Sequence, residues 1–373
     1  MIPLKYPKNI VRFNKLKSDY VSAYSNLTNM QAEWVRLKNA FPSLNVFPQR
    51  IATIMKANYR ELISFYISYH RISKTDQDNM KNALVALFNY DDKYREIIKA
   101  FLMNSVNGFE INTCHYCDMA YVNIYTIDPI DDGLYFMNTA SDDELKKKLN
   151  TKSNKTINIV CTNRPYYSIT DFKRVGKMLH WADNKFDKTF RLANNSRSNF
   201  DIDHVLDKGS CPIVALSLMN FVPSCQVCNS RLKKTRILGE NGIPKEKLSP
   251  TSPLHDFDNG VAIRILPKPG TFTTHPTQHR NDYNLIFDIS DKDYEYLVNL
   301  FKLEERYSYH KIEALRWIEL KRKYNDARII MMSNALGSNS DFTVDKIRED
   351  IFGSDFTNNE HRCFSKMKKD VLK

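Results

Sequence analysis

Two Cys-x-x-Cys pairs constrain the fold of this chain more than any other sequence feature. The first pair is Cys114 and Cys117, in TCHYCDMAYVNIY, and the second is Cys225 and Cys228, in SCQVCNSRLKK. One such pair alone is compatible with buried thiols or a redox dithiol, but each pair also supplies half of the tetrahedral thiolate shell that structural zinc prefers. The sequence therefore predicts that the four cysteines converge on one structural Zn²⁺, although a long segment separates the pairs.

The other cysteines and the histidine inside the first pair have simpler interpretations. Cys161, Cys211 and Cys363 lack a partner at ligand spacing, so we expect ordinary reduced thiols. His115 lies between Cys114 and Cys117, where it is close enough in sequence to replace a zinc ligand, but we expect it to face solvent.

A group of polar residues precedes the second cysteine pair. Asp203 and His204 are adjacent at the predicted end of a strand, Asn220 follows, and Asn229 comes directly after Cys228. A histidine with a pKa near neutrality suits the activation of water, and oxygen donors suit a hard cation such as Mg²⁺. Asp201 lies two residues before Asp203, where it either assists in metal binding or remains a solvated carboxylate. The segment thus has the residue types needed for phosphodiester hydrolysis.

Basic residues follow Asn229 on the same predicted short helix. Lys233 lies one turn from Asn229, so we expect it to face a phosphate backbone, together with the rest of the expected nucleic-acid-binding set, Arg231, Lys234 and Arg236. The other basic runs, at 146–148 and 321–323, are more typical of solvated faces.

The order Cys-x-x-Cys, Asp-His, Asn, Cys-x-x-Cys-Asn resembles the HNH endonucleases of the ββα-metal class, in the branch with a four-cysteine zinc site. The resemblance implies that His204 is the general base, that Asp203 and Asn229 hold a catalytic Mg²⁺ or Mn²⁺, and that Asn220 fixes the loop between two strands. The longer phrase LSLMNFVPSCQVCNSRLKK resembles the HNH nuclease subunit of Septu-type and retron-associated anti-phage defence systems. That likeness implies an ATPase partner that controls the nuclease.

The chain departs from the HNH pattern in three places. Asp207 and Lys208 stand where Pro-Lys is frequent, and His115 stands where proline is common. The segment between Cys117 and Asp203 is much longer than the short hairpin of many HNH modules, so an insertion at about 128–200 must fold out from the core.

Composition fits a polyanionic partner without specifying one. The formal net charge is +12 and the isoelectric point is about 9.2, which favours nucleic acid. The chain has no apolar run long enough to span a membrane and no secretory leader, so we expect neither membrane insertion nor secretion. Unpaired cysteines suit a reducing cytoplasm, which is the expected location.

The hydrophobic pattern predicts an α+β protein. Apolar residues from Phe13 to Leu37 recur at helical spacing, and 51–70 and 79–106 also read as helices. Strands are expected at 120–127, 157–161, 261–266 and 285–289, a loop at 194–199, and helices from Asp293 to Leu336. The aromatic residues Tyr20, Tyr24 and Trp34 either dock a regulatory partner or pack in the protein's own core.

Together these patterns predict a ββα-metal core with zinc knuckles, a helical N-terminal region at 1–105, a nuclease module at 106–240 and a mainly helical C-terminal region at 241–373. The predicted function is metal-dependent endonucleolytic cleavage of DNA in bacterial anti-phage defence. The alternatives are a zinc-organised binding or assembly protein without cleavage activity, and an HNH nuclease that acts on RNA.

Overall fold

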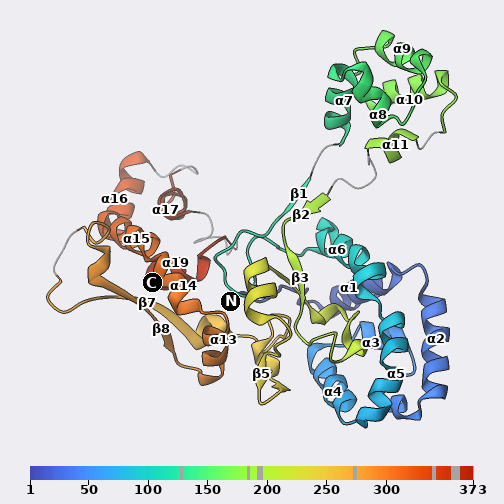
Figure 1. The fold of residues 1–373 in the computed structure, drawn as a ribbon. Helices are drawn as coiled ribbons and strands as arrows, with labels where there is room; N and C mark the ends of the chain where they lie inside the picture. Colours follow the sequence, from blue (N-terminus) through green and yellow to red (C-terminus); the bar gives the residue numbers. More distant parts are fainter. Residues whose placement is uncertain are drawn as a thin grey trace. The chain divides into compact units, whose positions relative to one another are not determined.

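The protein is a helix-rich α+β structure with several two-stranded antiparallel sheets, seen here in a computed structural model (Figure 1). The structure describes residues 1–126, 129–182, 185–190, 196–271, 275–337, 342–353 and 362–372. The chain divides into two compact units, one formed by Met1–Asn123 with Asn199–Lys373, and the other by Ile124–Ser198. The candidate site residues all belong to the first unit.

The first unit begins with a layer of helices. They are α1 (Ile10–Ser22), α2 (Leu27–Ala40), η1 (Pro42–Val46), α3 (Ile51–Met55), α4 (Tyr59–His70), α5 (Lys74–Leu87), η2 (Tyr90–Tyr94), α6 (Arg95–Met103) and η3 (Ser105–Asn107). The backbone of η2 is π-helical. The prediction of a helical N-terminal region is confirmed, although the stretches 51–70 and 79–106 are each divided into shorter helices.

The apolar stripe from Phe13 to Leu37 folds as two helices, α1 and α2, with a break at 23–26. The stripe continues across the break because Tyr20, Tyr24 and Trp34 are all buried. Tyr20 donates a hydrogen bond to the carbonyl of Leu216 at 2.8 Å, and Ser217 donates to the carbonyl of Ile54 at 2.9 Å. These aromatic residues therefore pack in the protein's own core, and the alternative that they dock a partner is wrong.

The centre of the first unit is a short hairpin followed by a helical turn. Strand β3 (Asp201–His204) pairs antiparallel with β4 (Phe221–Ser224), with Asp203 opposite Val222. The connection contains η4 (Pro212–Val214) and η5 (Leu218–Asn220), and β4 leads into the π-helical segment η6 (Val227–Lys233). As predicted, the strand ends at His204, where Asp207, Gly209 and Pro212 disfavour its continuation.

The C-terminal part of the first unit packs helices against a two-stranded sheet. Strand β7 (Val261–Pro267) pairs with β8 (Tyr283–Ile289), which confirms the two strands predicted there. The remaining elements are β5 (Gly239–Glu240), β6 (Ile243–Pro244), η7 (Glu246–Leu248), α12 (Phe257–Gly260), η8 (Arg280–Asp282), η9 (Lys292–Tyr294), α13 (Glu295–Leu300), α14 (Leu303–Tyr309), α15 (Lys311–Lys323), α16 (Asp326–Leu336), α17 (Val344–Phe352) and α19 (Ser365–Leu372). The helices predicted from Asp293 to Leu336 are thus present.

The second unit has its own hydrophobic core. Its ends are the paired strands β1 (Ile124–Thr126) and β2 (Ser196–Ser198). Between them lie α7 (Pro129–Thr139), α8 (Asp142–Lys148), α9 (Asn154–Thr162), α10 (Ile169–Met178) and α11 (Lys185–Phe190), around a core that includes Leu145, Phe172 and Phe186. Ile127, Asn194 and Asn195, in a predicted strand and loop, lie outside the described residues.

The strand predicted at Ile157–Cys161 is wrong, because this segment forms part of helix α9. Ser153 caps the helix by accepting a hydrogen bond from the amide of Thr156. Ile157 and Val160, three residues apart, face the core of the second unit. Burial on one helical face therefore outweighs the strand preference of the β-branched residues.

Among the described residues, no helix combines the length and the apolar character needed to cross a lipid bilayer.

Candidate active-site pocket and four-cysteine centre

The four cysteines of the two Cys-x-x-Cys pairs meet in the first unit. Their Sγ atoms lie within 4.8 Å of one another, and Cys114, Cys117, Cys225 and Cys228 are all buried. The first pair sits in a tight turn closed by a bridge between Thr113 and Tyr121, and the second joins the end of β4 to η6. The predicted convergence is confirmed, and the buried group is compatible with a bound metal such as zinc.

Residues of the C-terminal region hold the four-cysteine centre from one side. Arg306 Nη1 lies 3.4 Å from Cys228 Sγ, and Tyr307 donates a hydrogen bond to the carbonyl of Cys117 at 2.8 Å. The rings of Tyr116 and Phe301 stack with centroids 4.6 Å apart. Helix α14 and its neighbourhood thus pack directly against the first cysteine pair.

His115, inside the first cysteine pair, does not face solvent as the sequence suggested. The side chain is buried, and its Nδ1 lies 3.0 Å from the carbonyl oxygen of Ile2. The N-terminal segment covers this turn, since the amide of Ile2 also donates to the carbonyl of His115.

His204 is held at the end of β3 by a backbone contact. Its Nε2 lies 3.0 Å from the carbonyl oxygen of Ala215. Because a carbonyl only accepts, Nε2 carries the hydrogen, and in the neutral ring Nδ1 keeps the lone pair. The rings of Tyr90 and Phe221 contact the imidazole edge to face, at 4.4 and 5.2 Å. Burial lowers the pKa of His204 to about 3, so the ring is neutral near pH 7.

Asp203 precedes His204 on β3, lines the same pocket and is enclosed by two donors. Tyr116 donates a hydrogen bond to Oδ2 at 2.5 Å, and Lys233 Nζ lies 3.0 Å from the same oxygen. Burial raises the pKa of Asp203, while Lys233 and Tyr116 act in the other direction. Through Tyr116, the turn that carries the first cysteine pair is bonded directly to this carboxylate.

Lys233 does not lie on the surface, which contradicts the expectation that it faces a phosphate backbone. It is fully buried and also donates to the carbonyl of His204 at 2.7 Å. The helical step from Asn229 to Lys233 was read correctly, but the buried carboxylate of Asp203 draws the ammonium inward because an unpaired buried charge is costly.

Asn220 holds the connection between β3 and β4. Its Oδ1 accepts from the amide of Leu206 at 2.7 Å, and its Nδ2 donates to the carbonyls of Leu206 and Val214, both at 3.0 Å. The side chain is completely buried. Its contacts are structural, and they fix the loop that carries the Ala215 carbonyl.

Asn229 and Asp201 lie together, with Asn229 Nδ2 donating to Asp201 Oδ2 at 3.3 Å. Both side chains are partly exposed, and both line the same pocket as His204 and Asp203. Asp201 thus belongs to the candidate site rather than being only a solvated strand end, and its position on the same strand face as Asp203 was the signal for this.

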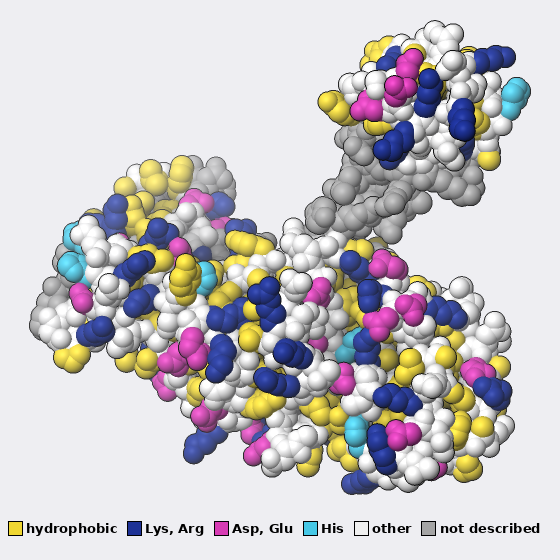
Figure 2. Space-filling model, viewed as in Figure 1, with side chains coloured by type: hydrophobic (Ala, Val, Ile, Leu, Met, Phe, Trp, Pro, Cys, Tyr) yellow, Lys and Arg dark blue, Asp and Glu magenta, His cyan; other side chains and the backbone are white. Residues whose placement is uncertain are grey.

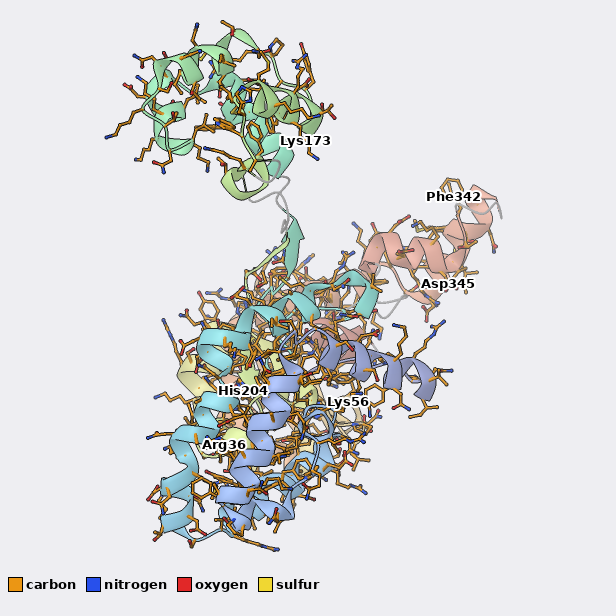
Figure 3. All side chains as sticks on the ribbon, turned by 90° about the vertical axis from the view of Figure 1, so that its right-hand side faces the viewer. Arg36, Lys56, Lys173, His204, Phe342 and Asp345 are labelled. Carbon is orange, nitrogen blue, oxygen red and sulfur yellow. The ribbon has the colours of Figure 1, made fainter. Side chains whose placement is uncertain are left out.

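The pocket has a volume of about 450 Å³, and β3 and η6 form only one side of it. Residues of η2 and α6 form another side, namely Tyr90, Asp91, Arg95, Glu96 and Lys99, and Lys208 and Lys234 complete the basic part of the lining. Figure 3 shows His204 beside the helices of the N-terminal region. Sequence reasoning missed the residues of η2 and α6, because no pattern in the sequence links them to β3.

Three of the four expected nucleic-acid-binding residues are exposed: Arg231, Lys234 and Arg236. On the face shown in Figure 2, dark blue basic side chains gather over the middle of the first unit. Only Lys234 of the expected set also lines the pocket.

No protein-family model, curated protein or solved structure is significantly similar to this chain. The functional interpretation therefore depends on the geometry of the site and on the sequence motifs.

Proposed function

We propose that the protein is a metal-dependent endonuclease of the HNH type, which hydrolyses phosphodiester bonds in DNA with His204 as general base. The observation that carries the proposal is the fixed orientation of His204. The Ala215 carbonyl occupies Nε2, which leaves Nδ1 to accept a proton in a pocket that also contains Asp201, Asp203 and Asn229.

The oxygen donors of the pocket suit a hard divalent cation. Asp201 and Asp203 offer carboxylates, and Asn229 offers an amide oxygen, since only its Nδ2 contacts Asp201. Tyr116 contacts Oδ2 of Asp203 and Lys233 contacts both carboxylate oxygens, so a cation bound at Asp203 would take the place of one of these contacts. We assign Asp203 and Asn229, with Asp201 added, as the residues that hold Mg²⁺ or Mn²⁺. Such an ion neutralises charge that develops on the phosphate oxygens.

The protein's own residues have distinct tasks in the proposed reaction. His204 removes a proton from the attacking water at Nδ1, because the Ala215 carbonyl holds the hydrogen of the neutral ring on Nε2. Asn220 keeps the loop that orients His204 in place. Tyr116 and Lys233 fix the position of the Asp203 carboxylate. The ββα arrangement expected from the HNH resemblance corresponds in this proposal to β3, β4 and η6.

In this proposal the four-cysteine centre holds a structural Zn²⁺. The buried, closed set of four thiols fits the coordination of structural zinc, which leaves no open position for a substrate. The ion ties the turn at Cys114 to the start of η6, so it holds Tyr116 and Asn229 in place from two sides.

The direct test measures cleavage of supercoiled plasmid DNA and of tRNA by the purified protein with Mg²⁺ or Mn²⁺. We expect DNA cleavage, reduced at least about 100-fold in His204→Ala, the usual effect of losing a general base. The matched control is His180→Ala, an exposed histidine of the second unit. Cleavage of tRNA alone would favour the RNA alternative. A His204→Ala protein that cuts DNA at the parental rate would exclude the proposed mechanism, and absence of any cleavage would favour the binding-protein alternative.

The proposed biological role is that of a nuclease effector in bacterial anti-phage defence, controlled by an ATPase partner. This part is supported by the resemblance of LSLMNFVPSCQVCNSRLKK to the nuclease subunit of Septu-type and retron-associated systems. Purification of the tagged protein from its native host should recover an ATPase, and purification without any ATPase would contradict this role.

A further inference from the structure

The pocket is lined by two stretches of chain that are far apart in sequence. Residues 90–99, in η2 and α6, form one part of the lining, and residues 200–208 with 229–234 form the other. Both η2 and η6 have π-helical backbones, a rare conformation that is frequent at functional sites. The N-terminal helices are therefore part of the pocket itself.

The contact between the two parts is fixed by packing. Tyr90 of η2 lies edge to face against His204 and stacks on Phe221, with centroids 4.4 and 6.0 Å apart. Lys208 Nζ lies 4.8 Å from the centroid of the Tyr90 ring and forms an ion pair with Asp91. Helix α6 consequently has a defined position relative to β3.

The cations of the pocket differ in whether they are already paired. Arg95 and Lys208 share the carboxylate of Asp91, with Arg95 Nη2 at 2.8 Å. Lys99 follows Arg95 by four residues, so it lies on the same face of α6. Within the described part of the chain, neither Lys99 nor Lys234 has a side-chain hydrogen bond or ion pair. The lining also contains the carboxylates of Asp91, Glu96, Asp201, Asp203 and Asp207, but the two lysines keep ammonium groups available for an anion.

Lys234 also has an unusual backbone. It ends η6 with φ +54° and ψ −123°, a region that glycine adopts readily and that L-residues rarely adopt. Glycine in place of Lys234 would relieve this conformation, so the contribution of the side chain can be tested separately from that of the backbone.

We propose that α6 forms the second half of the nucleic-acid-binding cleft, in which Lys99 from α6 and Lys234 from the end of η6 bind backbone phosphates on either side of the scissile bond. The inference rests on the proposed nuclease function, and it adds to the site a binding residue from the N-terminal region. Lysine ammonium groups contact phosphates without reading base edges, so this binding is independent of sequence.

The test uses full-length protein carrying His204→Ala, so that binding is measured without cleavage. The probes are a fluorescein-labelled 20-base-pair DNA duplex and a single-stranded RNA of equal length, titrated over a series of salt concentrations. We expect Lys99→Ala to weaken duplex binding several-fold and to reduce the slope of log Kd against log salt by about 0.9, the value for one lost phosphate contact. The control is Lys81→Ala, an exposed lysine of α5 that does not line the pocket.

Lys234→Gly separates a binding role from a structural one. Because glycine relieves the positive φ, we expect an unchanged or higher melting temperature together with weaker DNA binding. A structural role alone predicts no loss of affinity.

The inference would be overturned if Lys99→Ala bound the duplex with the same affinity and the same salt slope as the parent. It would also be overturned if Lys81→Ala lost as much affinity as Lys99→Ala, or if the parent bound neither probe. These outcomes are distinct from failure of the proposed function. A parent that cleaves DNA through His204 but binds without Lys99 refutes only the inference, and binding through Lys99 without His204-dependent cleavage refutes only the catalytic proposal.

Discussion

At the residue scale, the sequence predicted the positions of some side chains in the candidate site, but it did not predict all of their hydrogen-bond partners. Asn220 and Asn229 occupy positions that follow from their places beside strand β4 and Cys228. The partners of Asp203 were not predictable, because Tyr116 is distant in sequence and meets Asp203 only once the cysteine pairs converge. Motif spacing identifies the residues of a site, whereas tertiary packing decides what each one touches.

The burial of Lys233 leads to a prediction that separates it from its neighbour Lys234. In Lys233→Met, Asp203 loses its buried ammonium partner, so we expect the free energy of unfolding to fall by about 3–5 kcal/mol. In the exposed Lys234→Ala the change should stay within about 0.5 kcal/mol. Urea denaturation of both variants without added divalent metal provides the measurement. Equal stability of Lys233→Met and the parent would show that the Lys233–Asp203 ion pair does not stabilise the fold.

His255 predicts a loss of stability in mildly acidic solution. Burial lowers the pKa of His255 to about 4. The Met1 amine lowers this pKa further, whereas Asp258, Asp256 and the Lys247 carbonyl, 2.9 Å from Nδ1, raise it by smaller amounts. Between pH 6.5 and 4 the unfolded chain binds a proton that the folded protein does not bind. This contribution to stability is therefore present above pH 6.5 and is lost as the pH falls toward 4, by about 3 kcal/mol in total.

His255→Asn removes the titrating ring but keeps a donor for the Lys247 carbonyl. Its free energy of unfolding should fall less than that of the parent between pH 6.5 and 4 in denaturant titrations. Identical pH profiles would mean that His255 is not a source of the acid sensitivity.

At the element scale, periodicity predicted most helices and the pair β7 and β8, but not the elements that depend on neighbours. The segment Ile157–Cys161 is rich in β-branched residues and is nevertheless helical, because the core of the second unit buries one of its faces. The π-helical segments η2 and η6 have no sequence signature, yet both contribute to the pocket. The second half of the pocket was therefore beyond the reach of local patterns.

Removal of the proposed zinc should disorganise the elements that the four cysteines join. Elemental analysis should find about one zinc per chain, and Cys114→Ser should lose the metal and melt at a lower temperature, since structural zinc contributes directly to folding. Cys161→Ser, in the second unit and outside the cluster, serves as the control and should keep both the bound zinc and the parental melting temperature. Folded protein without zinc would contradict the assignment.

At the scale of the whole molecule, the pocket and the four-cysteine centre both belong to the first unit. The N-terminal helices and the segment from β3 to η6 line the pocket, and the C-terminal region packs against the four-cysteine centre through Tyr307. The second unit has a separate core and is connected through the paired strands β1 and β2. Chain order alone suggested three consecutive regions, because it does not show which distant segments share a core.

The two-unit organisation predicts opposite outcomes for two deletions. Thr126 pairs with Ser196, so replacing residues 127–195 with Asn-Gly should close β1 and β2 as a tight hairpin and leave the first unit folded, with its zinc and any His204-dependent cleavage. Deleting residues 1–105 should instead prevent folding, because it removes Tyr90 from His204 and the hydrogen bond from Tyr20 to the Leu216 carbonyl. Melting curves and zinc content measure both outcomes. An unfolded hairpin-closed variant, or a folded and zinc-loaded protein that begins at residue 106, would show that the two units are not organised in this way.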